Sequence, residues 1–315
     1  MHARPDKEAD VTVLFITYQQ DEEETLMSLR SVLRQKDICV EIVVSDDGSE
    51  ENHFDAIKAL FERYNFTRYK MLAHEENRGI IKNLIGALKE ASAKWVKVLS
   101  PGDFFYSEKV LSRWYVHVRR VGCDVSFGRH IMYRKIDAGY EMIPSVFRHR
   151  KNWAEDVFTS YITYDQSVGG CLAFHKKDCY LHYLELLAER GAILSEDASH
   201  IIMACERVKM DLYLENVIYY ERSGISAGFN SRLRDEHRIA FQIAMESDKI
   251  TDRERSILEL TWKRRWEGTA WTLSDRLRWY LYVPQWPFVK KQLYREHVAL
   301  EQRMDTEYIE RLKTD

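Results

Sequence analysis

The sequence has 315 residues, of which 45% are hydrophobic, and is therefore long enough to bury a large core. Its 47 basic and 50 acidic side chains give a formal net charge of −3, which excludes the basic surface expected of a general nucleic-acid binder. The cysteines are scattered without a C-x-x-C pair, so we expect neither a zinc site nor a disulfide framework, but a reducing, cytoplasmic compartment. We find neither a signal-peptide core nor an apolar run near the roughly 20 residues that span a bilayer.

Strands and helices are predicted to alternate along the first part of the chain. Apolar runs rich in β-branched residues predict strands over residues 11–17, 39–44, 69–73 and 95–99. Between them, apolar side chains recur at helical spacing, as in Leu26, Leu29 and Val32. This alternation is typical of βαβ units. The sequence therefore predicts an α/β fold with a mostly parallel sheet flanked by helices.

Polar side chains follow several of the predicted strands. They are Thr17 and Tyr18, the pair Asp46-Asp47, and Asp103. Right-handed crossovers place the carboxyl ends of parallel strands along one edge, so these groups should converge there. A nucleotide or phosphate site at this edge is the default hypothesis, although D-D-G-S is also an ordinary turn sequence. Neither G-x-G-x-x-G nor a P-loop motif is present.

The chain resembles the family-2 glycosyltransferases through motifs that keep the order and spacing of that family. They are F-I-T-Y (15–18), S-D-D-G-S (45–49), E-N-R-G-I-I-K-N-L-I-G-A-L (76–88), G-G-C-L-A-F (169–174), S-E-D (195–197) and Y-Y-E-R-S-G-I-S (219–226). The resemblance covers about residues 11–226 and implies a GT-A fold, which is a Rossmann-like α/β fold. It also implies inverting transfer of a sugar from a nucleotide diphosphate sugar, expected to be UDP-linked, to a glycan or lipid-linked acceptor in polysaccharide synthesis.

The resemblance also implies where the nucleotide binds. In this family the loop after the first strand and the D-D-G-S loop hold the base and the ribose. A carboxylate can accept a hydrogen bond from a base N–H, and a tyrosine ring can stack on the base. The implied nucleotide-binding residues are Thr17, Tyr18, Asp46, Asp47, Asn77, Gly79, Asn83, Arg222 and Ser226. For the last two residues a plain turn remains an alternative.

Asp103 is the metal ligand that the resemblance implies, with Mg²⁺ or Mn²⁺ as the ion. A divalent cation with oxygen ligands would neutralise the charge that develops on the leaving diphosphate. Family members usually carry D-x-D or D-D in this loop, whereas this chain has Ser100-Pro101-Gly102-Asp103 and keeps the last acidic position. The alternative is a Ser-Pro-Gly turn with a capping aspartate.

Glu196 and Asp197 stand where this family places the catalytic base. Inverting transfer needs one carboxylate to take the proton of the acceptor hydroxyl, and we expect Asp197 to do so while Glu196 orients it. Without the resemblance, an acidic pair before a helix would be ordinary complementation of the helix dipole.

The composition changes after Gly228, so we expect a catalytic domain over residues 1–228 and a helical extension over residues 229–315. The tail combines Trp271, Trp279 and Trp286 with basic neighbours, including Lys290 and Lys291. This pattern suits peripheral contact with the inner face of the cell membrane, or a helix docked on the catalytic domain or on a second subunit of a homo-oligomer.

The rival functions for the whole protein are a sugar nucleotidyltransferase and a non-catalytic nucleotide-binding or scaffold subunit.

Overall fold

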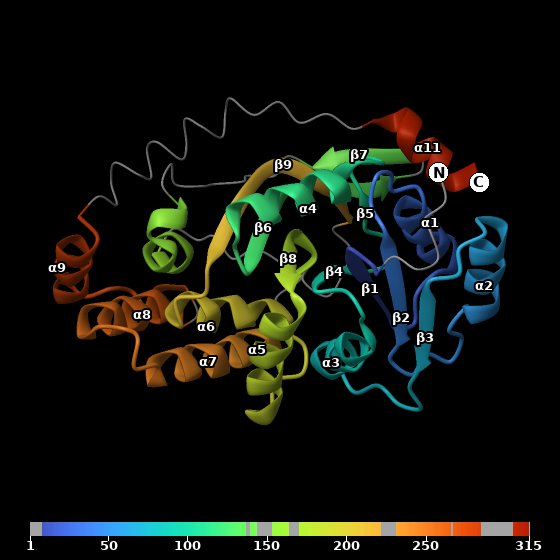
Figure 1. The fold of residues 1–315 in the computed structure, drawn as a ribbon. Coiled ribbons are helices and arrows are strands. Elements are labelled where there is room, and N and C mark those ends of the chain that lie inside the picture. The colour runs from blue at the N-terminus through green and yellow to red at the C-terminus, as the bar shows by residue number, and fades with distance from the viewer. Residues whose placement is uncertain are drawn as a thin grey trace.

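The computed structural model describes residues 8–136, 139–143, 153–163, 170–221, 231–265, 267–284 and 305–314 (Figure 1). The strands are β1 (Val11–Thr17), β2 (Val40–Asp46), β3 (Tyr69–Ala73), β4 (Trp95–Leu99), β5 (Phe104–Phe105), β6 (Val125–Ile136), β7 (Gly139–Ile143), β8 (Ala173–Lys176) and β9 (Met210–Glu221). The helices are α1 (Glu22–Leu33), α2 (Phe54–Arg63), α3 (Ile80–Glu90), α4 (Val110–Val121), α5 (Lys177–Glu189), α6 (Ser199–Cys205), α7 (Ser231–Glu246), α8 (Asp252–Arg265), α9 (Leu273–Tyr282) and α11 (Thr306–Thr314). Short helical turns include η2 (Thr159–Thr163), η3 (Gly170–Leu172) and η4 (Glu196–Ala198).

The strands form one mixed sheet in the order β3-β2-β1-β4-β8-β6-β9-β5, with β7 paired to β6. The first four strands of this order are parallel, which confirms the predicted βαβ arrangement, and β8 then joins β4 in the antiparallel direction. Strands β1 and β2 are buried on both faces, as expected for parallel strands covered by helices. Their register pairs Thr17 with Asp46, so the two strands end level with each other.

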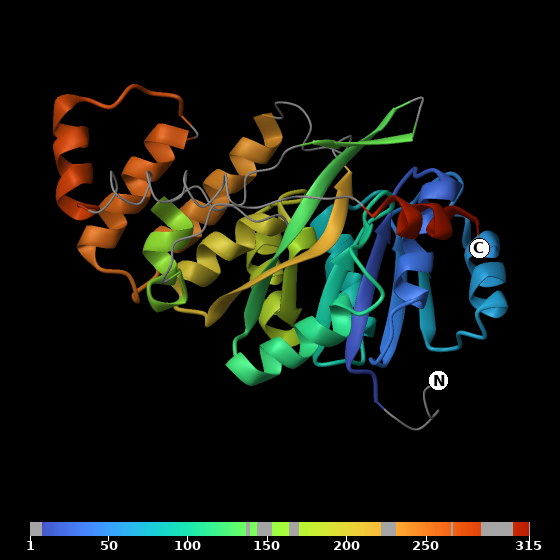
Figure 2. The same cartoon turned by 90° about the horizontal axis from the view of Figure 1, so that it is seen from above.

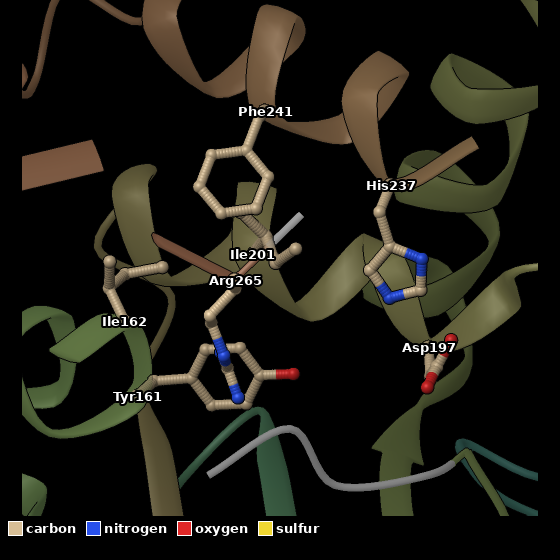
Figure 3. A pocket seen from close by; sticks show the side chains of 7 residues that line it. All are labelled: Tyr161, Ile162, Asp197, Ile201, His237, Phe241 and Arg265. Carbon is tan, nitrogen blue, oxygen red and sulfur yellow. The ribbon is translucent and has the colours of Figure 1, made fainter. Parts of the chain in front are cut away.

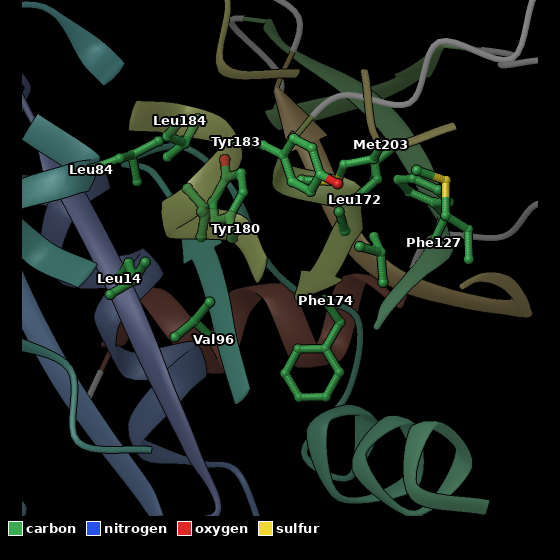
Figure 4. Close-up of a cluster of buried hydrophobic side chains, with 14 of the residues drawn as sticks. Leu14, Leu84, Val96, Phe127, Leu172, Phe174, Tyr180, Tyr183, Leu184 and Met203 are labelled. Carbon is green, nitrogen blue, oxygen red and sulfur yellow. The ribbon is translucent and has the colours of Figure 1, made fainter. Parts of the chain in front are cut away.

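The hydrophobic core runs without interruption from the parallel part of the sheet into the antiparallel part. Figure 4 shows Leu14 of β1 and Val96 of β4 in one cluster with Phe174 of β8 and Phe127 of β6. Helices α3 and α5 cover the cluster and also contact each other. Full burial of a Leu or Phe side chain contributes about 1.5–3 kcal/mol, so this core is the main reason that the two halves of the sheet hold one geometry.

The C-terminal helices pack on the sheet domain at separate places. Helices α7, α8 and α9 follow α6 in a row, each packing against the one before it. Helix α11 instead lies beside α1, as both views show, and Arg30 donates from Nη1 to the Leu312 carbonyl over 3.1 Å (Figure 2). Within the ranges described above, no helix is long and apolar enough to cross a membrane.

Candidate active site

The carboxyl ends of β1 and β2 are joined by the Asp46 side chain. Asp46 is buried and accepts hydrogen bonds from the Thr17 hydroxyl (2.9 Å), the Ser49 amide (2.8 Å) and the Ser49 hydroxyl (2.6 Å). Tyr18 follows β1 at the same edge and is 43% exposed, so its ring is available to a ligand. The structure therefore brings Thr17, Tyr18 and Asp46 together, as the sequence predicts.

Asp47 holds the start of α3 against this edge. Its carboxylate accepts hydrogen bonds from the backbone amides of Arg78 (3.0 Å) and Gly79 (2.8 Å), and Asn77 Oδ1 also accepts from Gly79 (3.0 Å). Gly79 has a φ of 86°, and a Cβ on it would lie 1.8 Å from Ile193 Cγ2. A side chain at this position would therefore push the chain segment that leads to Glu196 away from α3.

Asn83 lies one turn further along α3 and is 2% exposed. It donates from Nδ2 to the Ser45 carbonyl (3.1 Å) and accepts at Oδ1 from the Ser45 hydroxyl (2.5 Å). In this structure Asn83 thus fixes α3 to β2, beneath the edge where Tyr18 is exposed. Arg222 and Ser226 lie outside the described residues.

Asp103 follows β4 and is buried, with its Oδ1 accepting a hydrogen bond from the Glu221 amide of β9 (3.1 Å). Burial raises the pKa of Asp103 to about 7, although the Glu221 hydrogen bond and the charge of Lys97 oppose the rise. In the part of the chain that the structure describes, no group of three or more His, Cys, Asp or Glu side chains could hold a metal ion. Asp103 therefore belongs to no such group, although it stands at the metal position that the sequence predicts.

Glu196 and Asp197 form a half-buried acidic pair in η4. Burial raises the pKa of Glu196, and the neighbouring Asp197 carboxylate raises it further. Burial also raises the pKa of Asp197, but the charge of His237 opposes that rise. Two adjacent acids that share a site favour ionisation of one of them, and the His237 contact favours Asp197.

A small pocket opens at Asp197 (Figure 3). Asp197 and His237 lie close together on one side, while Tyr161, Phe241 and Arg265 line the rest of the pocket with Ile162 and Ile201. His237, Phe241 and Arg265 come from α7 and α8, and Tyr161 comes from η2. Sequence reasoning did not find these residues, because no local motif marks them and they meet only through tertiary packing.

The predicted nucleotide edge, which we define by Thr17, Tyr18 and Asp46, is connected to the acidic pair through Ile193. Its carbonyl accepts a hydrogen bond from the Ile81 amide at the start of α3 (2.9 Å), and its side chain faces Gly79. Ile193 precedes Glu196 by three residues. The chain segment that leads to Glu196 is therefore held against the start of α3.

Known structures with the same fold include TarS from S. aureus. The structure of TarS 1-349 in complex with UDP-GlcNAc matches with a TM-score of 0.60 and 15% identity, covering 87% of this chain and 79% of that one. The complex of TarS 1-349 with UDP matches with a TM-score of 0.58 and 14% identity over the same shares. At this identity the likeness shows the fold, which is that of the GT-A glycosyltransferases. No curated protein matches the sequence.

The family to which the chain belongs follows from its sequence. The model of the family described as "Glycosyl transferase family 2" matches residues 12–180, which is more than half of the chain. The matched part contains the nucleotide edge and Asp103 and ends inside α5. The protein therefore belongs to glycosyl transferase family 2.

Proposed function

We propose that the protein is an inverting glycosyltransferase that uses a nucleotide diphosphate sugar, with UDP as the expected nucleotide. The acceptor would be a hydroxyl of a glycan or a lipid-linked saccharide in polysaccharide synthesis. The observation that carries the proposal is the connection through Ile193 between the nucleotide edge at Asp46 and the acidic pair at Asp197. Supporting it, the TarS structures of the same fold contain UDP or UDP-GlcNAc.

In the proposed mechanism Asp197 is the general base. Its carboxylate takes the proton of the acceptor hydroxyl while that oxygen attacks the anomeric carbon from the face opposite the diphosphate. The bond between the anomeric carbon and the diphosphate oxygen breaks, and the anomeric configuration is inverted. Glu196, whose pKa is raised by burial and by Asp197, would stay protonated beside the base and orient it.

The residues at Asp103 fit a divalent cation that the protein holds jointly with its substrate. Mg²⁺ and similar ions are often bound by one or two carboxylates together with substrate phosphates, and Asp103 offers one such carboxylate. Glu221 Oε2 would lie 3.4 Å from a Cβ on Gly102, so a second carboxylate is near the same loop. When bound, Mg²⁺ or Mn²⁺ would neutralise charge on the leaving diphosphate.

The test of this function is release of UDP from UDP-sugars, measured with and without Mn²⁺ and with candidate acceptors. A transferase releases UDP and glycosylates the acceptor. A nucleotidyltransferase would instead consume the UDP-sugar only when pyrophosphate is added, and would form UTP. A scaffold subunit would bind UDP, with a rise in melting temperature, but would release none from a UDP-sugar.

Asp103→Asn should weaken Mn²⁺-dependent binding of UDP. The substitution keeps the shape of the side chain and removes its charge, which costs about 1.5–3 kcal/mol of binding, or roughly 10- to 100-fold in affinity. Titration calorimetry with Mn²⁺ and with EDTA measures the effect. Equal UDP affinity of the unsubstituted protein under both conditions would show that binding does not depend on the metal, in keeping with the Ser-Pro-Gly sequence of this loop.

We also propose that α9 makes peripheral contact with an anionic membrane surface. Its inner side packs on the protein, with Trp279 buried and Asp275 paired to Lys263 (2.5 Å). Its outer side is apolar, with Leu273, Leu277 and Leu281 exposed by 76%, 63% and 72%. Arg276 and Arg278 stand beside these side chains in the sequence, and basic residues next to an apolar helix side favour contact with anionic lipid.

Vesicle flotation tests this contact. The protein should float with vesicles that contain phosphatidylglycerol, less so at high salt, and the double substitution Leu277→Asp and Leu281→Asp should abolish flotation. Val116→Asp on α4 is the matched control, since Val116 is also exposed but lies away from α9. Failure to float, combined with a dimer in light scattering that the same double substitution dissociates, would assign this face to a second subunit.

A further inference from the structure

A lysine side chain lies fully buried in the strand that leads to Asp103. Lys97 is on β4, and its Nζ donates hydrogen bonds to the carbonyls of Val98 and Cys171, with a donor–acceptor distance of 2.5 Å in each. Burial lowers the pKa of Lys97 to about 8. Removing an ammonium group from water costs several kcal/mol unless hydrogen bonds compensate for it, so an apolar side chain would be the cheaper choice for a purely structural position.

The Cys171 carbonyl belongs to η3, and this turn contacts the acidic pair. The Gly170 amide hydrogen-bonds to the Glu196 carboxyl group. A Cβ on Gly170 would lie 2.5 Å from Glu196 Oε1 and 3.2 Å from Glu196 Cγ, so the backbone of the turn closely approaches this side chain. Any shift of η3 would therefore move Glu196, and with it the adjacent Asp197.

Lys97 thus connects the two ends of the site. It lies between the Asp103 loop, which follows β4, and the turn on which Glu196 rests, and its charge attracts Asp103. We propose that Lys97 is a positioning residue: by holding the Cys171 carbonyl, it fixes η3 and so keeps the Glu196-Asp197 pair aligned with the donor site. This inference rests on the proposed function, because it assigns Asp197 to the transfer step.

Lys97→Met tests the inference, because methionine fills a similar volume and has no donor. We expect kcat for sugar transfer to fall by roughly 10- to 100-fold, since small misplacements of a catalytic group can cost about 100-fold. The KM for the donor should change much less than kcat, because Lys97 makes no hydrogen bond to the nucleotide edge at Asp46 and acts on Asp103 only through its charge. Assays run well below the melting temperature separate this loss from a loss of folded protein.

Gly170→Ala provides the second variant. It pushes on Glu196 directly and leaves the Lys97 hydrogen bonds in place, so it should lower kcat by a similar factor. The double variant should be no slower than the slower single variant, because both substitutions disturb the same contact. Glu41→Gln is the control: Glu41 is also buried and accepts from Thr12 and Ser92, so its loss should lower the melting temperature and leave kcat unchanged.

Hydrogen exchange separates a failure of this inference from a failure of the proposed function. Lys97→Met should speed amide exchange in the segments 170–172 and 196–198, whereas Glu41→Gln should not. Both results are expected whether or not the protein transfers sugar. Unchanged exchange in these segments would overturn the positioning role. A Lys97→Met variant that is less stable but keeps its kcat would also overturn this role. The same holds if the loss of kcat in the double variant equals the product of the losses in the two single variants.

Discussion

Asp197→Asn is expected to slow sugar transfer by about 10²–10⁴-fold, the range that a positioned general base usually supplies. Asparagine keeps the shape of the side chain, but its amide does not take a proton from the acceptor. UDP binding should change little, because Asp46 and Tyr18 at the nucleotide edge come from other elements. Initial rates of transfer and a UDP thermal shift, measured on the same protein, test both statements.

Glu196→Gln is the matched control for that substitution. Burial and the Asp197 charge raise the pKa of Glu196, so glutamine resembles the protonated form that the folded protein favours. The loss of rate should therefore be smaller than for Asp197→Asn. If Glu196→Gln has the larger effect, Glu196 is the base. If Asp197→Asn instead abolishes UDP binding or lowers the melting temperature by many degrees, the carboxylate serves to cap the helix.

The pH dependence of kcat gives a further test of the same base. Because burial raises the pKa of Asp197, the rate should fall with decreasing pH at a higher pH than for an ordinary aspartate. The electrostatic interaction with His237 favours the ionised carboxylate and so opposes this shift. Its removal in His237→Gln should raise the pKa of Asp197 and move the acidic limb of the profile to higher pH. An acidic limb that stays in place would show that His237 does not act on the base.

The parallel strands could be predicted from the sequence, because apolar runs alternate with helical patterns at a spacing that fits βαβ units, but the order of the strands in the sheet could not. The position of Thr17, Tyr18 and Asp46 at one edge of the sheet could also be predicted, because these residues lie at the ends of those strands. The burial of Asp46 and Asp47 could not be predicted from the sequence. Their cost inside the protein is offset by hydrogen bonds from the Thr17 hydroxyl and the Gly79 amide, which are some thirty residues away in the chain.

The residues that surround Asp197 and Lys97 in the structure could not be predicted from the sequence. His237 and Arg265 line the same pocket as Asp197 and come from helices that lie in the predicted C-terminal extension. Lys97 stands in a strand sequence, W-V-K-V-L, whose pattern predicts burial but gives no partner for the ammonium. Its partners are the backbone carbonyls of Val98 and Cys171, and any residue type can supply a carbonyl. Contacts of this kind are set by tertiary packing, and no side-chain pattern marks them.

Asp46→Asn should remove most of the thermal stabilisation that UDP with Mn²⁺ gives, while the protein itself stays folded. The carboxylate already accepts hydrogen bonds from Thr17 and Ser49, and a carboxylate can accept about four, so a base N–H can still join them. Asparagine retains an acceptor for the loop and loses the charge. The loss of a charge-assisted hydrogen bond costs about 1.5–3 kcal/mol, or roughly 10- to 100-fold in Kd.

The same two strands supply the control for this substitution. Thr12 and Glu41 pair across β1 and β2 at the opposite end, with a hydrogen bond of 2.5 Å, as Thr17 and Asp46 do at the site. Glu41→Gln should therefore cost a comparable amount of stability and leave the UDP-induced shift in melting temperature intact, because a ligand stabilises only through its own binding. An equal shift in Asp46→Asn and in the unsubstituted protein would place the nucleotide away from Asp46, and the carboxylate would then serve only to join β1 to the loop after β2.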